Sequence, residues 1–163
     1  AGDVIISPGV KIYHHAIIKG PAYIGKNTLV GDGALIRESM IGENCIIGYH
    51  TEIARSWIGD HNSFHTAYAG DSVIQGSTNM AVGSVCANLR LDQQEINSSG
   101  RTKLGAIIGP NTNIGVNVCI MPGLKIGANS ILGPGLNITQ DVPDNSYCPP
   151  NAQLTVRHNK LSH

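Results

Sequence analysis

The chain has 163 residues, a formal net charge of +0 at pH 7 and a pI near 7.2. This length suits one domain, and the neutral balance removes the electrostatic motive for binding nucleic acid or an anionic membrane surface. With 20 glycines and 4% aromatic residues, the composition excludes a core of bulky rings and favours narrow coils with tight turns around aliphatic side chains.

The chain carries no apolar run of the ~20 residues that a membrane-spanning helix needs, and no charged-then-apolar leader. Its four cysteines are widely spaced without a CxxC pair, which argues against a zinc knuckle or a disulfide framework. We therefore expect a cytoplasmic protein with reduced thiols and no membrane partner. The first residue is Ala1 rather than methionine, which we interpret as a fragment or a processed chain.

Aliphatic residues recur every six positions at both ends of the chain. They run from Ile6 to Ile36 in sixes, continue in mixed steps of five and six, and return to strict sixes from Ile108 to Ile138. A period of six fits neither a helix nor an alternating strand. It is typical of the hexapeptide left-handed parallel β-helix, in which three hexads close a triangular coil of about 18 residues. We predict an all-β fold of about seven such coils.

One segment interrupts the repeat. Between Cys86 and Ile107 the chain is polar and charged and keeps no hexad register. A solenoid accommodates such a segment as a loop extruded from a corner, commonly on its binding face, although a tolerated surface insertion is the alternative. Prolines interrupt the pattern again near the C-terminus. We predict a β-helix over residues 1–140, with an extruded loop at about 88–105, and a segment over 141–163 that caps its open end.

A histidine occupies a predicted corner where neighbouring hexads carry glycine or another small residue. His65 directly follows inward-facing Phe64, so its side chain should point outward beside a turn. Tyr68 lies three residues on, and the extruded loop offers Asn88 and Lys103. These residue types suit a general-base site, and a surface histidine without function is the alternative.

The other histidines were considered as zinc ligands. A zinc site on this fold would need three converging histidines, and His50, His61 and His65 do not have ligand spacing in the hexad register. We therefore predict no metal.

Four ordered motifs follow one another between residues 65 and 109. They are His65-Thr66-Ala67-Tyr68-Ala69-Gly70-Asp71, Asn79-Met80-Ala81-Val82-Gly83, Ala87-Asn88-Leu89-Arg90 and Lys103-Leu104-Gly105-Ala106-Ile107-Ile108-Gly109. Together they resemble the acetyltransferase domain of the bifunctional sugar-1-phosphate nucleotidylyltransferases, which belongs to the hexapeptide-repeat acyltransferases. The resemblance implies a homotrimer of left-handed β-helices with the active site between subunits.

The reaction that the resemblance implies is acetyl transfer from acetyl-CoA to the 2-amino group of glucosamine-1-phosphate or galactosamine-1-phosphate. His65 would be the base, with Tyr68 and Asn88 beside it, in a direct transfer within a ternary complex. The resemblance assigns the sugar phosphate to Arg37, Arg55, Asn79 and Lys103, and the coenzyme to Ala81, Val82 and Gly83.

Two departures concern substrate choice and rate. Leu89 stands where one familiar form of the loop has tyrosine, and Val82 is bulkier than the usual residue near the thioester. The nucleotidyl-transferring domain is absent from the sequence, so the resemblance implies an additional N-terminal domain. A non-catalytic trimerisation or regulatory hexapeptide module is the alternative from another functional class.

Overall fold

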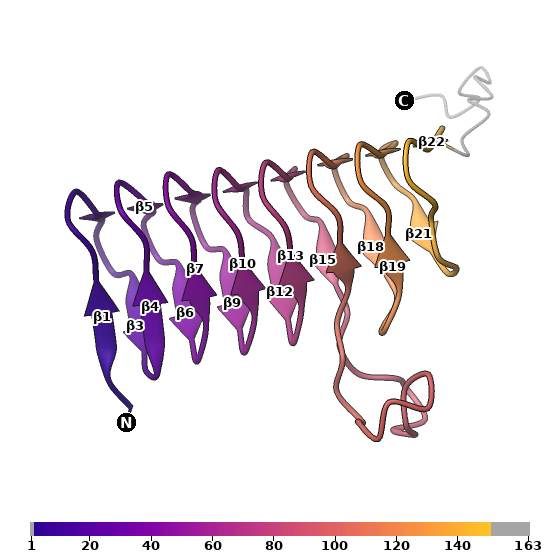
Figure 1. Ribbon diagram of the computed structural model, residues 1–163, viewed down its shortest axis with the longest axis horizontal. Coiled ribbons are helices and arrows are strands. Elements are labelled where there is room, and N and C mark those ends of the chain that lie inside the picture. Colours follow the sequence, from indigo (N-terminus) through magenta and orange to yellow (C-terminus); the bar gives the residue numbers. More distant parts are fainter. Residues whose placement is uncertain (1, 151–163) are drawn as a thin grey trace, which may run out of the picture.

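The structure is a computed structural model that describes residues 2–150 of the chain. These residues form a long triangular prism of short parallel strands, stacked coil upon coil along one axis (Figure 1). Each coil gives one strand to each of three sheets. The predicted left-handed parallel β-helix is confirmed, with seven complete coils and the start of an eighth.

The first sheet contains β1 (Val4–Ile6), β4 (Ala22–Ile24), β7 (Met40–Ile41), β10 (Trp57–Ile58), β13 (Val73–Ile74), β16 (Ile107–Ile108) and β19 (Lys125–Ile126). The second contains β2 (Lys11–Ile12), β5 (Leu29–Val30), β8 (Ile46–Ile47), β11 (Ser63–Phe64), β14 (Asn79–Met80), β17 (Asn113–Ile114), β20 (Ile131–Leu132) and β22 (Tyr147–Cys148). The third contains β3 (Ile17–Lys19), β6 (Leu35–Arg37), β9 (Glu52–Ala54), β12 (Tyr68–Gly70), β15 (Val85–Cys86), β18 (Cys119–Ile120) and β21 (Asn137–Ile138).

We call the connection from the first to the second sheet the first corner, from the second to the third the second corner, and from the third back to the first the third corner. In residues 2–150 the regular elements are all strands, and this part of the chain holds no helix that could cross a membrane.

The inward residues of adjacent coils pair in register and fill the prism. Ile24, Ile41 and Ile58 form one such column, because β4, β7 and β10 pair at these positions. All three are buried, as is Phe64, the single phenylalanine of the chain. Removal of these stacked side chains from water fixes the register of each coil on the next.

The five-residue steps in the sequence arise mainly at the third corner. Only two residues separate β6 from β7, β9 from β10 and β12 from β13, and the second of each pair is a serine. The amide of Ser56 donates to Ser39 Oγ at 3.1 Å, and the amide of Ser72 donates to Ser56 Oγ at 3.0 Å. These buried hydroxyls satisfy backbone donors that the tight corner turns inward.

The extruded loop leaves the prism where the sequence predicted, between β15 and β16, and projects from the third corner (Figure 1). Its neck is an antiparallel bridge between Leu89 and Lys103. Farther out, the Ile96 side chain is buried and Asn97 Nδ2 donates to the Gly123 carbonyl at 2.8 Å. The bridge therefore closes the neck of the loop, and Asn97 fastens its outer part to the next coil.

The sequence predicted a cap from residue 141 onward, but the residues directly after 140 continue the coil. Val142 bridges Ile126 in parallel, and β22 pairs with β20, so the coil continues past 140. Pro143 does not stop it, because the amide that proline lacks would face a further coil along the axis, as the amide of Gly127 faces the Val142 carbonyl. The remainder of the predicted cap, residues 151–163, lies outside the described residues.

Candidate active site

His65 begins the second corner of the fourth coil, immediately after β11. Its amide donates to the Met80 carbonyl at 3.0 Å, as the amide of Gly48 donates to the Phe64 carbonyl one coil earlier. The imidazole is exposed, and its Nε2 lies 3.2 Å from Ser63 Oγ. Its place at an outer corner confirms the expected outward direction and leaves the ring accessible to a substrate.

The outer face of the third sheet carries a layer of polar side chains beside this corner. Arg37 on β6 and Glu52 on β9 form an ion pair, with Arg37 Nε and Nη2 at 3.1 and 2.6 Å from the same carboxylate oxygen. Tyr68 on β12 is paired with Glu52 in register. Ala54 follows the inward-facing Ile53 in the same sheet and is fully buried, because the larger polar side chains cover it.

Asp71, at the third corner, links the other polar groups. Arg55 holds its carboxylate with two hydrogen bonds, Nε to Oδ1 at 2.7 Å and Nη2 to Oδ2 at 2.8 Å, and Asn88 Nδ2 donates to the same Oδ2. Tyr68 Oη and Asn88 Nδ2 both lie over the Cα of Gly70, where any Cβ would collide with them. Glycine at this position is thus what lets the phenol and the amide meet.

Burial and neighbouring charges shift the pKa values of this layer. Partial burial raises the pKa of Tyr68, and the Glu52 carboxylate raises it further, so the phenol remains a proton donor at neutral pH. Burial also raises the pKa of Asp71, but hydrogen bonds from Arg55 and Asn88 outweigh it and hold that pKa below its usual value. The carboxylate is consequently ionised and anchors Arg55 and Asn88.

The neck of the extruded loop completes the third-corner side of the site. The amide of Gly105 donates to the Asp71 carbonyl at 2.8 Å, and the amide of Leu104 donates to the Asn88 carbonyl at 2.9 Å. The positive charge of Lys103, an exposed side chain, contributes to lowering the Asp71 pKa. The structure therefore brings Asn88 and Lys103 together with Arg55, as a shared site requires.

The residues assigned to the coenzyme lie apart from this layer. Ala81 lines a groove of about 440 Å³ on the second sheet, together with Tyr147. Asn79, which the resemblance assigns to the sugar phosphate, lines the same groove and is thus separated from the arginines and Lys103. The amides of Ala81 and Gly83 donate to backbone carbonyls of Ile114 and Thr66, at 3.0 and 3.1 Å. These two amides are occupied, which restricts an oxyanion-binding role in this stretch to Val82.

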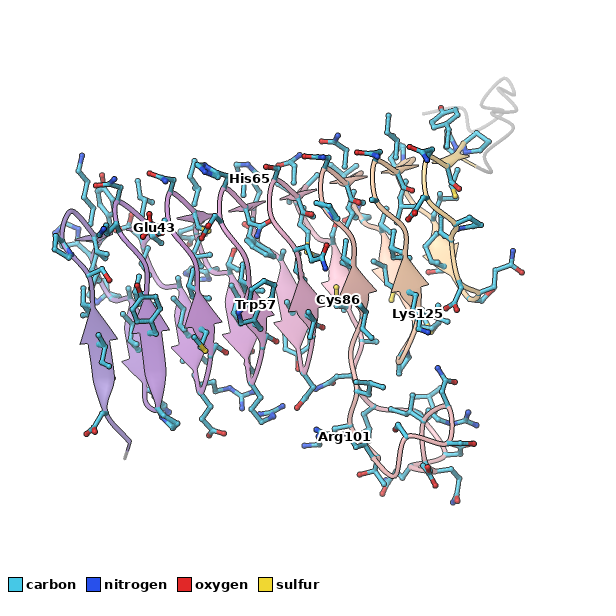
Figure 2. The ribbon with its side chains drawn as sticks, viewed as in Figure 1. Glu43, Trp57, His65, Cys86, Arg101 and Lys125 are labelled. Atoms are coloured by element: carbon cyan, nitrogen blue, oxygen red, sulfur yellow. The ribbon has the colours of Figure 1, made fainter. Side chains whose placement is uncertain are left out.

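The site therefore occupies one face and its two edges. His65 stands at the second corner and the arginines and loop neck at the third, with Glu52 and Tyr68 between them. Figure 2 shows His65 on the upper edge of the prism and Arg101, in the extruded loop, on the opposite side. The structure separates His61 from His50 and His65, because His61 lies at a first corner. Within residues 2–150 no group of three or more His, Cys, Asp or Glu side chains is placed to hold a metal ion.

The sequence interpretation missed two acidic residues. Asp71 stands in the His65 to Asp71 motif but was given no role, and Glu52 lies one coil before Tyr68. The signal that could have found Glu52 is its position one residue before the inward-facing Ile53, as Tyr68 stands one residue before Ala69 in the next coil, although the exact register depends on corner lengths.

Residues 1–87 match the family model of the GMPPB C-terminal domain, and residues 105–140 match the bacterial transferase hexapeptide model of six repeats. The first match covers more than half of the chain. The chain belongs to the GMPPB C-terminal domain family. The hexapeptide match places this family member among the hexapeptide-repeat transferases and confirms the predicted class.

Curated relatives confirm the resemblance stated from the motifs. The bifunctional protein GlmU of Clostridium novyi is 39% identical over 117 residues, which is 71% of this chain and 23% of the relative. The bifunctional sugar-1-phosphate nucleotidylyltransferase/acetyltransferase of Sulfurisphaera tokodaii is 39% identical over 131 residues, 74% of this chain and 33% of the relative. This family member thus spans about a quarter to a third of the length of these relatives.

A solved structure shares the fold. AntD, an N-acyltransferase from Bacillus cereus, was solved as a mutant in complex with dTDP-4-amino-4,6-dideoxyglucose and coenzyme A. It superimposes with a TM-score of 0.51 at 17% identity, covering 96% of this chain and 84% of AntD. At this identity the likeness concerns the fold alone.

Proposed function

We propose that the protein is an N-acetyltransferase that moves the acetyl group of acetyl-CoA to the 2-amino group of an amino-sugar 1-phosphate, glucosamine-1-phosphate or galactosamine-1-phosphate. The Sulfurisphaera tokodaii relative, which is named a bifunctional sugar-1-phosphate nucleotidylyltransferase/acetyltransferase, supports this substrate class. The observation that carries the proposal is the polar face of the third sheet, with His65 at one edge and the arginines at the other.

His65 is the proposed general base. An ammonium group cannot attack a thioester, so a base must first remove a proton, and an exposed imidazole suits this at neutral pH. The amine nitrogen then forms a bond to the thioester carbon, the carbon–sulfur bond breaks, and the coenzyme thiolate leaves and takes up a proton. Tyr68 and Asn88 orient the sugar through hydrogen bonds.

The transfer is proposed to be direct, without an acetylated enzyme. Cys86, the cysteine of β15, points into the core, and complete burial raises the pKa of its thiol to about 12. A protonated, buried thiol is a poor nucleophile. Double-reciprocal plots of the initial rate against one substrate, at several concentrations of the other, should therefore give intersecting rather than parallel lines.

The third-corner cations are proposed to bind the sugar phosphate. Arg37 and Arg55 both use Nε and Nη2 to hold carboxylates, so each offers Nη1 to a phosphate oxygen while Glu52 and Asp71 fix its orientation. Lys103 adds a third positive charge from the loop neck. In this arrangement the sugar lies across Tyr68 with its phosphate toward the third corner and its amine toward His65.

The coenzyme is proposed to approach along the second corner. Ala81, Val82 and Gly83 follow His65 by one coil, and the Val82 amide would polarise the thioester oxygen. Asn79 and the groove that it lines are suited to bind another part of the ligands. We further propose a cytoplasmic homotrimer in which a second chain packs over the polar face of the third sheet, and an N-terminal nucleotidylyltransferase domain in the full protein.

The experiment is to follow thiol release from acetyl-CoA with either amino-sugar 1-phosphate, and to identify the acetylated product by mass spectrometry. Glucose-1-phosphate serves as the matched control, because it offers the phosphate without the amine. We expect turnover only with an amino sugar. Binding without turnover, or no response to either sugar, would favour the non-catalytic trimerisation or regulatory module instead.

A further inference from the structure

The corner that carries His65 is shorter than its counterparts. At every other second corner with both strands described, four residues connect the two sheets, as residues 48–51 do between β8 and β9. Between β11 and β12 there are only three, His65, Thr66 and Ala67. The general base therefore stands on the one second corner from which a residue is missing.

The missing residue removes a backbone hydrogen bond. At the longer corners, the third residue's amide donates to the carbonyl of the second residue one coil earlier, as from His50 to Asp32 at 3.1 Å and from Asn117 to Val82 at 2.9 Å. The short corner has no equivalent amide for the Tyr49 carbonyl. The Thr66 hydroxyl takes its place and donates to this carbonyl at 3.0 Å.

Thr66 also performs the next step of the ladder. Its own carbonyl accepts a hydrogen bond from the Gly83 amide at 3.1 Å, as the carbonyl of the second of the four residues does in a longer corner. Its φ is 45°, the left-handed conformation that the third of the four residues has in a longer corner, such as His50 at 50° and Asn117 at 54°. Thr66 thus combines two positions in one residue.

This conformation is strained for threonine. Thr66 is the one β-branched residue among the non-glycine residues of positive φ in residues 2–150; the other residues at equivalent corner positions are glycine, histidine or asparagine. A backbone conformation of this kind is unfavourable for a β-branched residue and persists only where its surroundings hold it in place. The hydrogen bond from the Thr66 hydroxyl to the Tyr49 carbonyl is an interaction that holds this conformation in place.

The first residue of a second corner is glycine in some coils and a residue with a side chain in others. One coil earlier, a Cβ on Gly48 would collide with the Phe64 carbonyl oxygen. His65 occupies the same step of the ladder with a full imidazole. Tyr13 and Ala81 also carry side chains at the first position of four-residue corners, so the shorter corner changes the path of the chain after His65 rather than the room for its Cβ.

We propose that Thr66 is the positioning residue of the general base, whose hydroxyl bond to the Tyr49 carbonyl closes the shortened corner and thereby sets the direction of the His65 imidazole. The proposal rests on the acetyltransferase function proposed above. In this proposal Thr66 acts through His65 and takes no part in the chemical step itself.

The test compares Thr66→Val, which keeps the shape but loses the hydroxyl, with Thr66→Ser, which keeps the hydroxyl. Thr139→Val, at an exposed threonine of the seventh coil, is the matched control. We expect Thr66→Val to lower kcat about tenfold or more with little change in KM for acetyl-CoA, and Thr66→Ser to retain activity within about threefold. Circular dichroism before each assay establishes that the variants are folded.

A second measurement is independent of turnover. The His65 ring resonances, assigned in ¹⁵N-labelled protein by their loss in His65→Gln, should move in Thr66→Val and stay near their wild-type positions in Thr66→Ser and Thr139→Val. If wild-type protein transfers no acetyl group, the proposed function fails while the ring spectra still test the positioning. A folded Thr66→Val protein with wild-type ring resonances would overturn the inference, as would wild-type kcat in an active enzyme.

Discussion

Asp71 shows how one carboxylate organises several functional side chains. It accepts hydrogen bonds from Arg55 and Asn88, and its main chain receives the returning loop at Gly105. The sequence presented it as part of a motif, yet its partners come from other coils and from the loop. A pattern read along the chain cannot show such contacts, because they depend on the register between coils.

The low pKa of Asp71 gives a pH-dependent prediction. A carboxyl group whose pKa is lowered by folding stabilises the protein above its unfolded pKa, and this contribution is lost as pH falls through the folded-state pKa. We expect Asp71→Asn to lower the free energy of unfolding at pH 7 by about 1–3 kcal/mol. The difference from wild type should narrow as the pH falls below about 4.

Urea unfolding followed by circular dichroism between pH 3 and pH 7 measures this difference. Asp92→Asn is the matched control, since Asp92 pairs with Arg90 in the loop with both side chains about half exposed. An exposed pair contributes little, so its removal should leave the urea midpoint nearly unchanged. A difference between wild type and Asp71→Asn that stays constant over this pH range would contradict the assignment.

Among the elements, the extruded loop departs most from the repeat. Its composition and position predicted an extruded loop with a functional role, with a tolerated surface insertion as the alternative. The structure fastens it through buried Ile96, whose side chain lies over the Cα of Gly123 in the next coil. A single isoleucine in a polar segment was the available signal, but nothing in the sequence indicated which coil it would contact.

Ile96→Ala should release the tip of the loop while leaving the prism intact. Loss of the buried side chain removes the packing against Gly123, and a released loop lets the backbone beside the already exposed Arg90, Arg101 and Lys103 adapt to the active site of trypsin. We expect cleavage between residues 88 and 105 to accelerate about tenfold or more, with little change in thermal unfolding of the β-helix. Leu91→Ala, at a fully exposed side chain, is the control and should be cut at the wild-type rate.

The coils themselves were largely predictable. Ile24, Ile41 and Ile58 follow the repeat and pair as it predicts, because a stacked aliphatic column tolerates little variation. The five-residue steps could also be read from the sequence, but the corners at which they fall could not be predicted. The step from Phe64 to Ala69 looks like the others in the sequence, yet it alone shortens a second corner, and this places His65 and Thr66 in an unusual geometry.

At the scale of the molecule, one chain offers an open polar face rather than an enclosed site. Tyr68 and Glu52 are half-buried on the outer side of the third sheet, and His65 is exposed at its edge. Catalysis by general base and precise positioning requires that bulk water be limited around the reacting groups. A second chain packed along the prism would provide the missing wall.

Assembly is therefore a prediction of the same account. Sedimentation equilibrium should give a mass about three times the 17.2 kDa of the chain, and dilution that dissociates the trimer should abolish acetyl transfer in parallel. A monomer with the full activity per chain would contradict a site shared between subunits. It would leave the third-sheet face as a complete site by itself.

The measurement that tests the central claim most directly is the rate of acetyl transfer by wild-type protein and by His65→Gln, on the amino sugar that the wild type prefers. The account predicts that His65→Gln loses about two or more orders of magnitude in kcat while its circular dichroism and sedimentation remain those of the wild type. Equal rates in the two proteins would show that the corner histidine is not the base, and the chemistry of this face would have to be assigned to another group.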